Sequence, residues 1–195
     1  MKKKAIGLTE EGIQIAVLPE DGTAPEAEAY AALGKTYKDT ATLETEEGET
    51  VSCECEELDD PEDEVQIPGK TTLKFSTSDL DPTSCHRALG GTLSEDGSEW
   101  AAPDSFTAKE VAVRFTTKSG LSVQIGRAKM STRINWAIKK DGYGLLEHTL
   151  TVLTPKVAGM RKMTVTDTSV VPTVPNPEPE PDAETEQSFD NEDQY

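Results

Sequence analysis

Apolar residues recur at every second position in several separate segments between residues 70 and 155. A period of two puts successive side chains on opposite faces of an extended strand, so each segment has one apolar and one polar face. Strands of this kind are typical of antiparallel sheets that bury one side. The apolar positions are, in chain order, Leu73, Phe75, Val111, Val113, Phe115, Val123, Ile125, Leu146, Leu150 and Val152.

Turn-forming residues divide this region into separate strands. We expect strands at residues 70–77, 109–117, 121–136 and 145–154, and a weaker edge strand at 163–174. The strand at 121–136 is long. Gly126 and Arg127 in its middle predict a bulge or bend that lets the strand serve two sheets.

Residues 36–69 predict a hairpin followed by an acidic loop. Strands at 36–44 and 49–56 are expected to pair through residues 46–48, where Gly48 supplies the tight-turn conformation. The following segment, 58–69, is dense in Asp, Glu and Pro. Like charges repel one another and do not pack inward, so we expect this loop to project from the fold.

A short helix is expected to interrupt the strand series. Asp81 is a suitable N-cap and Pro82 a suitable first helical residue, and Gly90 with Gly91 ends the helix. A helix this short is not stable alone, so its apolar side must dock on the sheet. The predicted fold class is mainly β: an antiparallel two-sheet β-sandwich or barrel with one short flanking α-helix.

The chain divides into three expected parts. Residues 1–34 mix Gly, Ala, Glu and Pro, include a possible helical turn or two at 26–33, and predict an N-terminal arm with a short strand. Residues 35–172 contain the expected β-sandwich domain. Residues 173–195 carry a run of Pro, Glu and Asp that is typical of a disordered acidic tail.

The formal net charge of −18 is concentrated in two segments. Residues 44–64 contain 12 acidic residues and residues 172–195 contain 8, with no Lys or Arg in either, so the remaining chain has 17 acidic against 19 basic residues. The long-range field of such a chain repels DNA, which argues against a sequence-specific nucleic-acid reader. No apolar run approaches the roughly 20 residues that cross a membrane.

Residue types that often carry catalysis or bind metals are sparse and scattered. Cys53 and Cys55 lie two residues apart, but no close Cys or His pair completes a four-ligand site with them, so reduced thiols, Cys85 included, packed in a sheet are favoured over a zinc site. His148 shares a strand face with apolar residues, which predicts a partly buried structural histidine. The acids of residues 54–64 lack the ligand spacing of a calcium loop, so a solvated acidic loop is favoured. We therefore expect no enzyme activity, no metal and no cofactor.

The segment 127–136, in the second part of the long strand, is the most basic part of the body. Arg127, Lys129 and Arg133 are expected to lie on one of its faces. Two interpretations of this face are open. It contacts the acidic loop of a neighbouring subunit, or it is a solvated outer face of the sheet.

Several short motifs follow one another in a fixed order between residues 34 and 155. They are GKTYKDT at 34–40, PGKTTLKFS at 68–76, DLDP at 79–82 with LGG at 89–91, WAAP at 100–103, RAKMSTRINW at 127–136 and TVLTP at 151–155. In this order and spacing the chain resembles the major tail tube proteins of long-tailed bacteriophages, in the version seen in phages of gut Bacteroides-type hosts.

The resemblance implies a structural virion protein with a β-sandwich or barrel-like core. Six copies would form a ring, and stacked rings would enclose a conduit through which double-stranded DNA leaves the capsid without specific binding. Other phage tail proteins would be further partners, and the protein would reside in the virion tail, or in the host cytoplasm during assembly. The resemblance assigns inter-subunit contacts to the N-terminal arm and to the loop at 58–68, with Leu58, Asp59, Asp60, Glu62, Asp63 and Glu64 as its candidate residues. Arg127, Lys129 and Arg133 are candidates through the electrostatic contact considered above.

Two other classes of protein compete with this interpretation. A capsid decoration protein, or another small β-sandwich virion protein, would occupy a lattice without polymerising. An acidic glycan-binding or glycan-active module would need a cleft and an aromatic sugar platform, and only 5% of the residues are aromatic. Self-assembly of the purified protein into rings or tubes of uniform diameter separates these possibilities.

Overall fold

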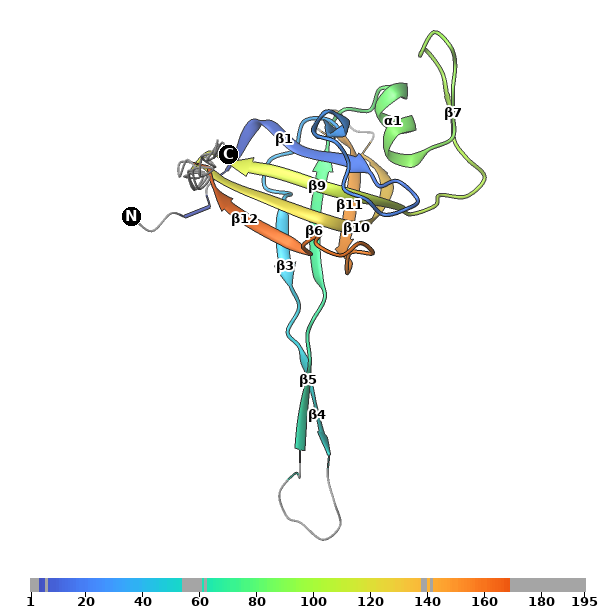
Figure 1. Cartoon of the computed structure of the whole chain (residues 1–195). Coiled ribbons are helices and arrows are strands. Elements are labelled where there is room, and N and C mark those ends of the chain that lie inside the picture. The colour runs from blue at the N-terminus through green and yellow to red at the C-terminus, as the bar shows by residue number, and fades with distance from the viewer. Residues whose placement is uncertain are drawn as a thin grey trace, which may run out of the picture.

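The computed structural model describes residues 4–5, 7–53, 61, 63–137, 140 and 142–168. Within these ranges the chain is mainly β, its paired strands are antiparallel, and α1 (Pro82–Leu89) is the only α-helix (Figure 1). This part of the predicted fold class is confirmed.

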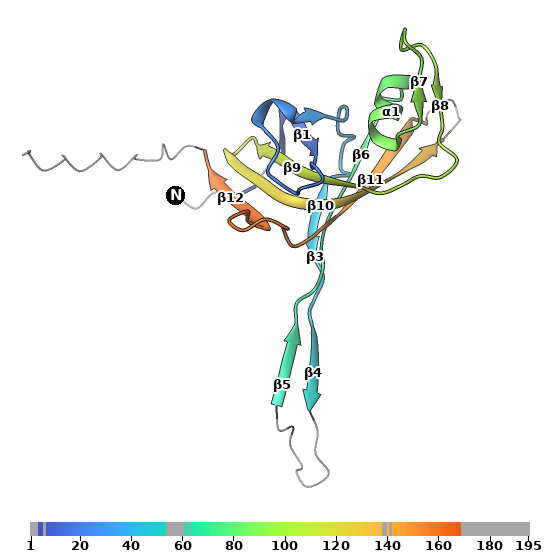
Figure 2. The ribbon, with the colours of Figure 1, turned by 45° about the vertical axis from the view of Figure 1, so that its right-hand side comes forward.

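Eight strands form one continuous hydrogen-bonded sheet, in the order β2-β1-β9-β10-β11-β6-β3, with β12 also paired to β10. The sheet bends, so that β1 and β9 cross over β6 and β11 (Figures 1 and 2). We expected two separate sheets. Instead, the two layers are two parts of one continuous, bent sheet. The strands are β1 (Leu8–Val17), β2 (Ala31–Ala32), β3 (Thr42–Thr45), β6 (Thr71–Thr77), β9 (Lys109–Thr117), β10 (Leu121–Trp136), β11 (Gly144–Val152) and β12 (Met163–Asp167).

The bend is located in β10, where the sequence predicts it. The register between β9 and β10 shifts between Ile125 and Ala128. One edge of β10 pairs with β12 before the bulge and with β11 after it, so a single strand joins both parts of the sheet. Gly126 permits this because a Cβ there would lie 2.5 Å from the backbone oxygen of Arg161.

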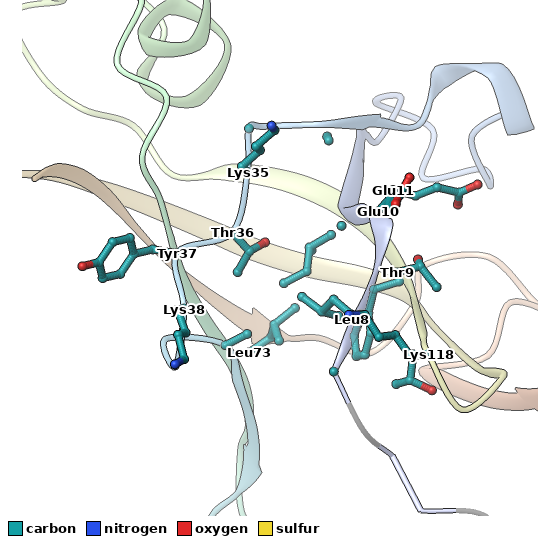
Figure 3. Close-up of a pocket in the computed structure, with 18 of the residues that line it drawn as sticks. Leu8, Thr9, Glu10, Glu11, Lys35, Thr36, Tyr37, Lys38, Leu73 and Lys118 are labelled. Carbon is teal, nitrogen blue, oxygen red and sulfur yellow. The ribbon is translucent and has the colours of Figure 1, made fainter.

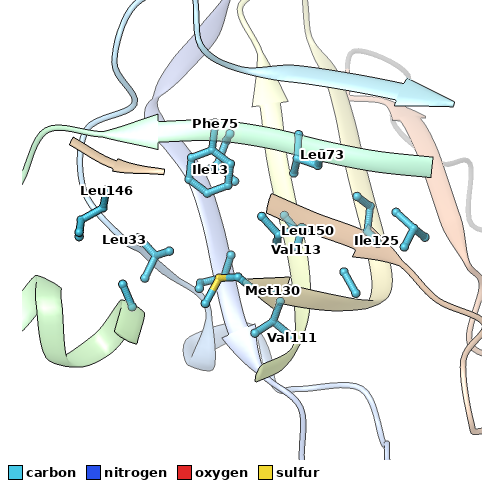
Figure 4. Close-up of a cluster of buried hydrophobic side chains, with 14 of the residues drawn as sticks. Ile13, Leu33, Leu73, Phe75, Val111, Val113, Ile125, Met130, Leu146 and Leu150 are labelled. Carbon is cyan, nitrogen blue, oxygen red and sulfur yellow. The ribbon is translucent and has the colours of Figure 1, made fainter. Parts of the chain in front are cut away.

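The hydrophobic core lies between the two parts of the bent sheet (Figure 4). Alternating positions of β1, β9 and β10 meet those of β6 and β11, as the period-two pattern requires. Cys85, Ala88 and Leu89 add the apolar side of α1. The core residues with no exposed surface are Val111, Val113, Ile125, Ala128, Leu146 and Leu150.

The strand expected in residues 1–34 is present as β1, but the expectation that this segment is an arm and not a core element is wrong for residues 8–17. Ile13 and Ile15 are only 2% and 6% exposed, and β1 pairs with β9 along most of its length. The reason is a pairing partner about a hundred residues away, which no local signal reveals. Residues 26–33 also differ from expectation, since they form only the 3-10 turn η1 (Ala27–Ala29) and then β2.

The helix α1 has the boundaries that its capping residues predict. The Asp81 carboxylate accepts a hydrogen bond from the Ser84 backbone N–H at 3.1 Å, and Gly90 is the C-cap. Two side chains satisfy backbone oxygens at the other end: Lys109 Nζ donates to Arg87 at 2.8 Å, and Trp100 Nε1 donates to Gly90 at 2.7 Å. Trp100 belongs to the small ribbon of β7 (Thr92–Leu93) and β8 (Trp100–Ala101).

The expected hairpin between residues 36–44 and 49–56 is wrong. Instead β3 pairs with β6, while β4 (Glu49–Cys53) pairs with β5 (Asp63–Ile67). Residues 46–48 therefore connect β3 to β4 without reversing the direction of the chain. The segment expected to be a loop at 58–69 contains strand β5 in its second half.

Candidate assembly surfaces

Strands β4 and β5 form a two-stranded ribbon that projects away from the sheet (Figure 2). Thr45 pairs with Thr71 in the sheet, and Glu49 pairs with Ile67 in the ribbon. Three residues on each arm, 46–48 and 68–70, separate these two pairs, so the pairing register is the same on both sides. The projecting ribbon is thus a straight extension of β3 and β6.

Two glycines allow the arms to approach closely where the ribbon leaves the sheet. A Cβ on Gly69 would lie 1.9 Å from the backbone oxygen of Glu46, and one on Gly48 would lie 2.6 Å from that of Ile67. The Glu46 N–H also donates to the Lys70 oxygen at 2.9 Å. Only residues without a side chain fit this crossing.

One face of the ribbon carries three exposed apolar side chains, flanked by Glu49 and Asp63. Val51 pairs with Val65, and the alternation of the strands puts Ile67 on the same face. Their exposed fractions are 48%, 59% and 50%, so the fold of one chain does not cover them. An isolated two-stranded ribbon is marginally stable in water, and a contiguous exposed apolar patch is typical of an interaction surface.

The acidic residues expected at an inter-subunit contact lie at this ribbon as far as the structure describes them. Asp63 and Glu64 are exposed at the start of β5, and they point to opposite faces because they are consecutive. The other four expected acidic-loop contacts, Leu58, Asp59, Asp60 and Glu62, lie outside the described residues. The projection expected of this segment is confirmed for its described part.

The basic residues expected on one face of β10 are not all available to a neighbour. Arg127 donates from Nη2 and Nε to both Glu110 oxygens, at 2.7 and 3.0 Å, and from Nη1 to the Thr154 oxygen at 2.8 Å. Arg133 pairs with Glu147 of β11. Lys129 is exposed. Because both arginines already bind carboxylates of their own chain, the solvated-face interpretation is favoured for this part of the sheet.

The two ion pairs hold their carboxylates in the charged form. Hydrogen bonds from Arg127 and from Lys156 lower the pKa of Glu110 to about 2. Hydrogen bonds from Asn135 and Arg133 likewise lower the pKa of Glu147. These interactions connect β9, β10 and β11 across the outer face of the sheet.

The structure brings two tyrosines together that the sequence did not single out. The rings of Tyr37 and Tyr143 have centroids 6.0 Å apart. We call Tyr37 and Tyr143 the aromatic cluster. Their exposed fractions are 38% and 67%, so this cluster is a second uncovered apolar surface. The glycines around Tyr143 were its only sequence signal.

A cleft of about 1180 Å³ lies where the sheet does not close on itself, between β1 and residues 34–43. Figure 3 shows Leu8 and Thr9 of β1 on one side and Thr36 and Tyr37 on the other. The hydroxyls of Thr9 and Thr36 are buried without a hydrogen-bond partner. Neither a histidine nor a cysteine lines the cleft, and no group of three or more metal-ligating side chains is found among the residues that the structure describes.

The expected structural histidine is confirmed and is more deeply buried than predicted. His148 is 1% exposed, and its ring packs on Phe75 with centroids 4.8 Å apart. The thiols differ from expectation: Cys85 is buried on α1 and Cys53 is exposed on β4, while Cys55 lies outside the described residues. No helix in the described part of the chain is long and apolar enough to cross a membrane.

Comparison of the chain with protein-family models and with curated proteins gives no match. The two uncovered surfaces, the ribbon and the aromatic cluster, are therefore the features on which a function can be argued.

Proposed function

We propose that this protein is a structural subunit that assembles with copies of itself, as the major tail tube protein of a long-tailed phage does. Six subunits would form a ring, and stacked rings would enclose the conduit for phage DNA. The observation that carries the proposal is the projecting ribbon, whose apolar face of Val51, Val65 and Ile67 is left uncovered.

The energetics of the ribbon favour assembly. It has only two strands and no packing layer of its own, so its apolar face gains stability when another protein surface covers it. Each Å² of apolar surface that is removed from water stabilises the assembled state by about 25 cal/mol. The partner most consistently available to a virion subunit is another copy of the same chain.

The bent sheet is compatible with the sandwich or barrel core of a tube subunit. Its two parts enclose one core, while β1 and residues 34–43 leave the side of the barrel open at the cleft. The nearly balanced charge outside the two acidic segments, 17 acidic against 19 basic residues, also suits a conduit, because a wall without a concentrated basic stripe does not hold the DNA phosphates that must slide past it.

Electron microscopy of the purified protein tests this proposal. Negatively stained samples across a concentration series are expected to contain rings or tubes of uniform diameter, with light scattering that rises cooperatively. Val65→Lys places a charge on the apolar face and is expected to raise the concentration needed for assembly about tenfold or more. Gln66→Lys adds the same charge to the opposite face of the same strand and serves as the matched control.

Two results would contradict the proposal. One is a chain that stays monomeric at every concentration, which instead fits a decoration protein. The other is assembly of the Val65→Lys variant at the same concentration as the unmodified protein and the control, because the ribbon face would then play no part.

A further inference from the structure

The ribbon and the aromatic cluster lie at opposite ends of the same strand pair. The ribbon enters the sheet at Thr71, and Thr72 of β6 pairs with Thr151 near the end of β11. At the other end of the pair, Thr77 faces Leu146, and Tyr143 directly precedes β11. Figure 2 shows the ribbon extending on one side of the body and β11 beginning on the opposite side, near α1.

We infer that the aromatic cluster receives the apolar face of the ribbon from the next copy of this chain. The inference rests on the proposed function, since it names the two surfaces that would join consecutive subunits along the assembly. Each subunit offers one ribbon and one cluster, so the contact is head to tail.

The geometry determines what such a contact builds. A contact between two different surfaces at opposite ends of one subunit leaves a free ribbon and a free cluster after every addition. Between subunits of successive rings it propagates along the tube, whereas a rotation between copies that closes would give a ring instead. A contact of ribbon with ribbon would be symmetric and would end at a pair of subunits.

The chemistry of the two surfaces is complementary. The ribbon presents the branched side chains of Val51, Val65 and Ile67, and flat aromatic rings pack well against β-branched residues. The same ribbon face carries the exposed acidic residues Glu49, which pairs with Ile67, and Asp63. Exposed lysines lie next to the cluster in the chain, Lys38 after Tyr37 and Lys140 before Tyr143. Opposite charges around an apolar centre favour this pairing and orient the approach.

A mixing experiment tests the inference with two variants that are blocked at different ends. Val65→Lys damages the ribbon and leaves the cluster intact, whereas Tyr143→Asp damages the cluster and leaves the ribbon intact. Each variant alone is expected to need at least about tenfold more protein to assemble. Mixed together, they are expected to form complexes with one junction and no longer products, measured by light scattering after size-exclusion chromatography. If the mixture behaves like either variant alone, the head-to-tail contact is overturned.

Cross-linking identifies the contact independently. Cys53 lies on the same ribbon face as Val51, and Cys85 is buried, so a Cys55→Ser background leaves Cys53 as the exposed attachment point among the three cysteines. A benzophenone maleimide on Cys53 is expected to label a peptide containing Tyr143 of another copy. Cys53→Ser controls for other attachment sites.

The outcomes separate this inference from the proposed function. Normal tubes in which Cys53 labels a different surface would overturn the inference and leave the proposed function standing. A protein that never assembles would overturn both. If Tyr143→Asp assembles normally but loses retention on a column of immobilised glycans, the cluster is a sugar platform and the inference is wrong.

Discussion

Thr77 and His148 are joined by a buried hydrogen bond of 3.0 Å between Oγ1 and Nε2, and both residues are at most 1% exposed. On the other side of the ring, Nδ1 lies 2.9 Å from Oγ1 of Thr132. A neutral imidazole has one donor and one acceptor nitrogen, so one threonine donates and the other accepts. Burial disfavours the charged ring and lowers the pKa of His148 to about 4.

This site predicts that stability falls with acidification. The unfolded histidine takes up a proton near its usual pKa of 6.5, whereas the folded one does so only near 4, so the unfolded state binds more protons between these values. The free energy of unfolding should decrease by about 1 kcal/mol from pH 7.5 to 5.5, a range in which ordinary carboxyl groups stay ionised. Urea denaturation at each pH measures it.

His148→Gln is the control for this prediction. It removes the titrating group but retains a polar side chain between the two threonines. Its unfolding free energy should be lower overall and nearly constant from pH 7.5 to 5.5. An identical pH slope in both proteins would show that another group is responsible.

Gly69→Ala is expected to separate the arms of the ribbon. Its Cβ would lie 1.9 Å from the Glu46 oxygen, so the backbone must move. Amide exchange at residues 49–53 should become about tenfold faster, while the melting temperature of the body changes little. Gln66→Ala, an exposed ribbon position without this constraint, should leave exchange unchanged. Unaltered protection in Gly69→Ala would contradict the close crossing.

The two arginine pairs of β10 are expected to differ in their contribution to stability. The side chain of Arg127 is 16% exposed and makes three hydrogen bonds at the bulge, whereas that of Arg133 is 79% exposed. Arg127→Ala should lower the melting temperature by about 2–4 °C, and Arg133→Ala by about 1 °C or less. Calorimetry in low salt measures both. Equal shifts would mean that the difference in burial has no consequence.

The helix cap gives a smaller and more local effect. Asp81→Ala removes the acceptor of the Ser84 N–H and should lower the unfolding free energy by about 1 kcal/mol. Asp81→Asn keeps an acceptor at the N-cap and should recover most of that loss. Thermal denaturation of the two variants provides the comparison, and an Asp81→Asn protein as unstable as Asp81→Ala would contradict the capping role.

Features with local causes were predictable from the sequence. Asp81 and Gly90 determine the ends of α1 because each acts on its own helix terminus. The alternation of Val111 and Val113 similarly identifies β9, because side-chain direction in a strand depends only on position along it. The bulge at Gly126 was predictable because a glycine inside a strand often marks a bulge.

Features that depend on distant partners were not predictable. Gly48 suggests a reversing turn, and only the pairing of Glu49 with Ile67 reveals that the chain passes straight through. Val65 was predicted to lie in a loop because acidic residues precede it, whereas it belongs to strand β5. The sequence predicts that the charge of Arg127 is available to a partner. The structure shows that the register with β9 places Glu110 beside it, and the two residues form an ion pair. Tyr37 and Tyr143 meet only because β6 and β11 pair.

The unchanged register across the glycine crossing constrains how the ribbon can vary among descendants of this gene. A single-residue insertion in one arm would turn Val51 or Val65 toward the polar side and misalign every rung beyond it. A longer ribbon that keeps the same residues on the same face needs two additional residues in each arm. Homologues should therefore differ in reach by paired steps, with both glycines retained at the base.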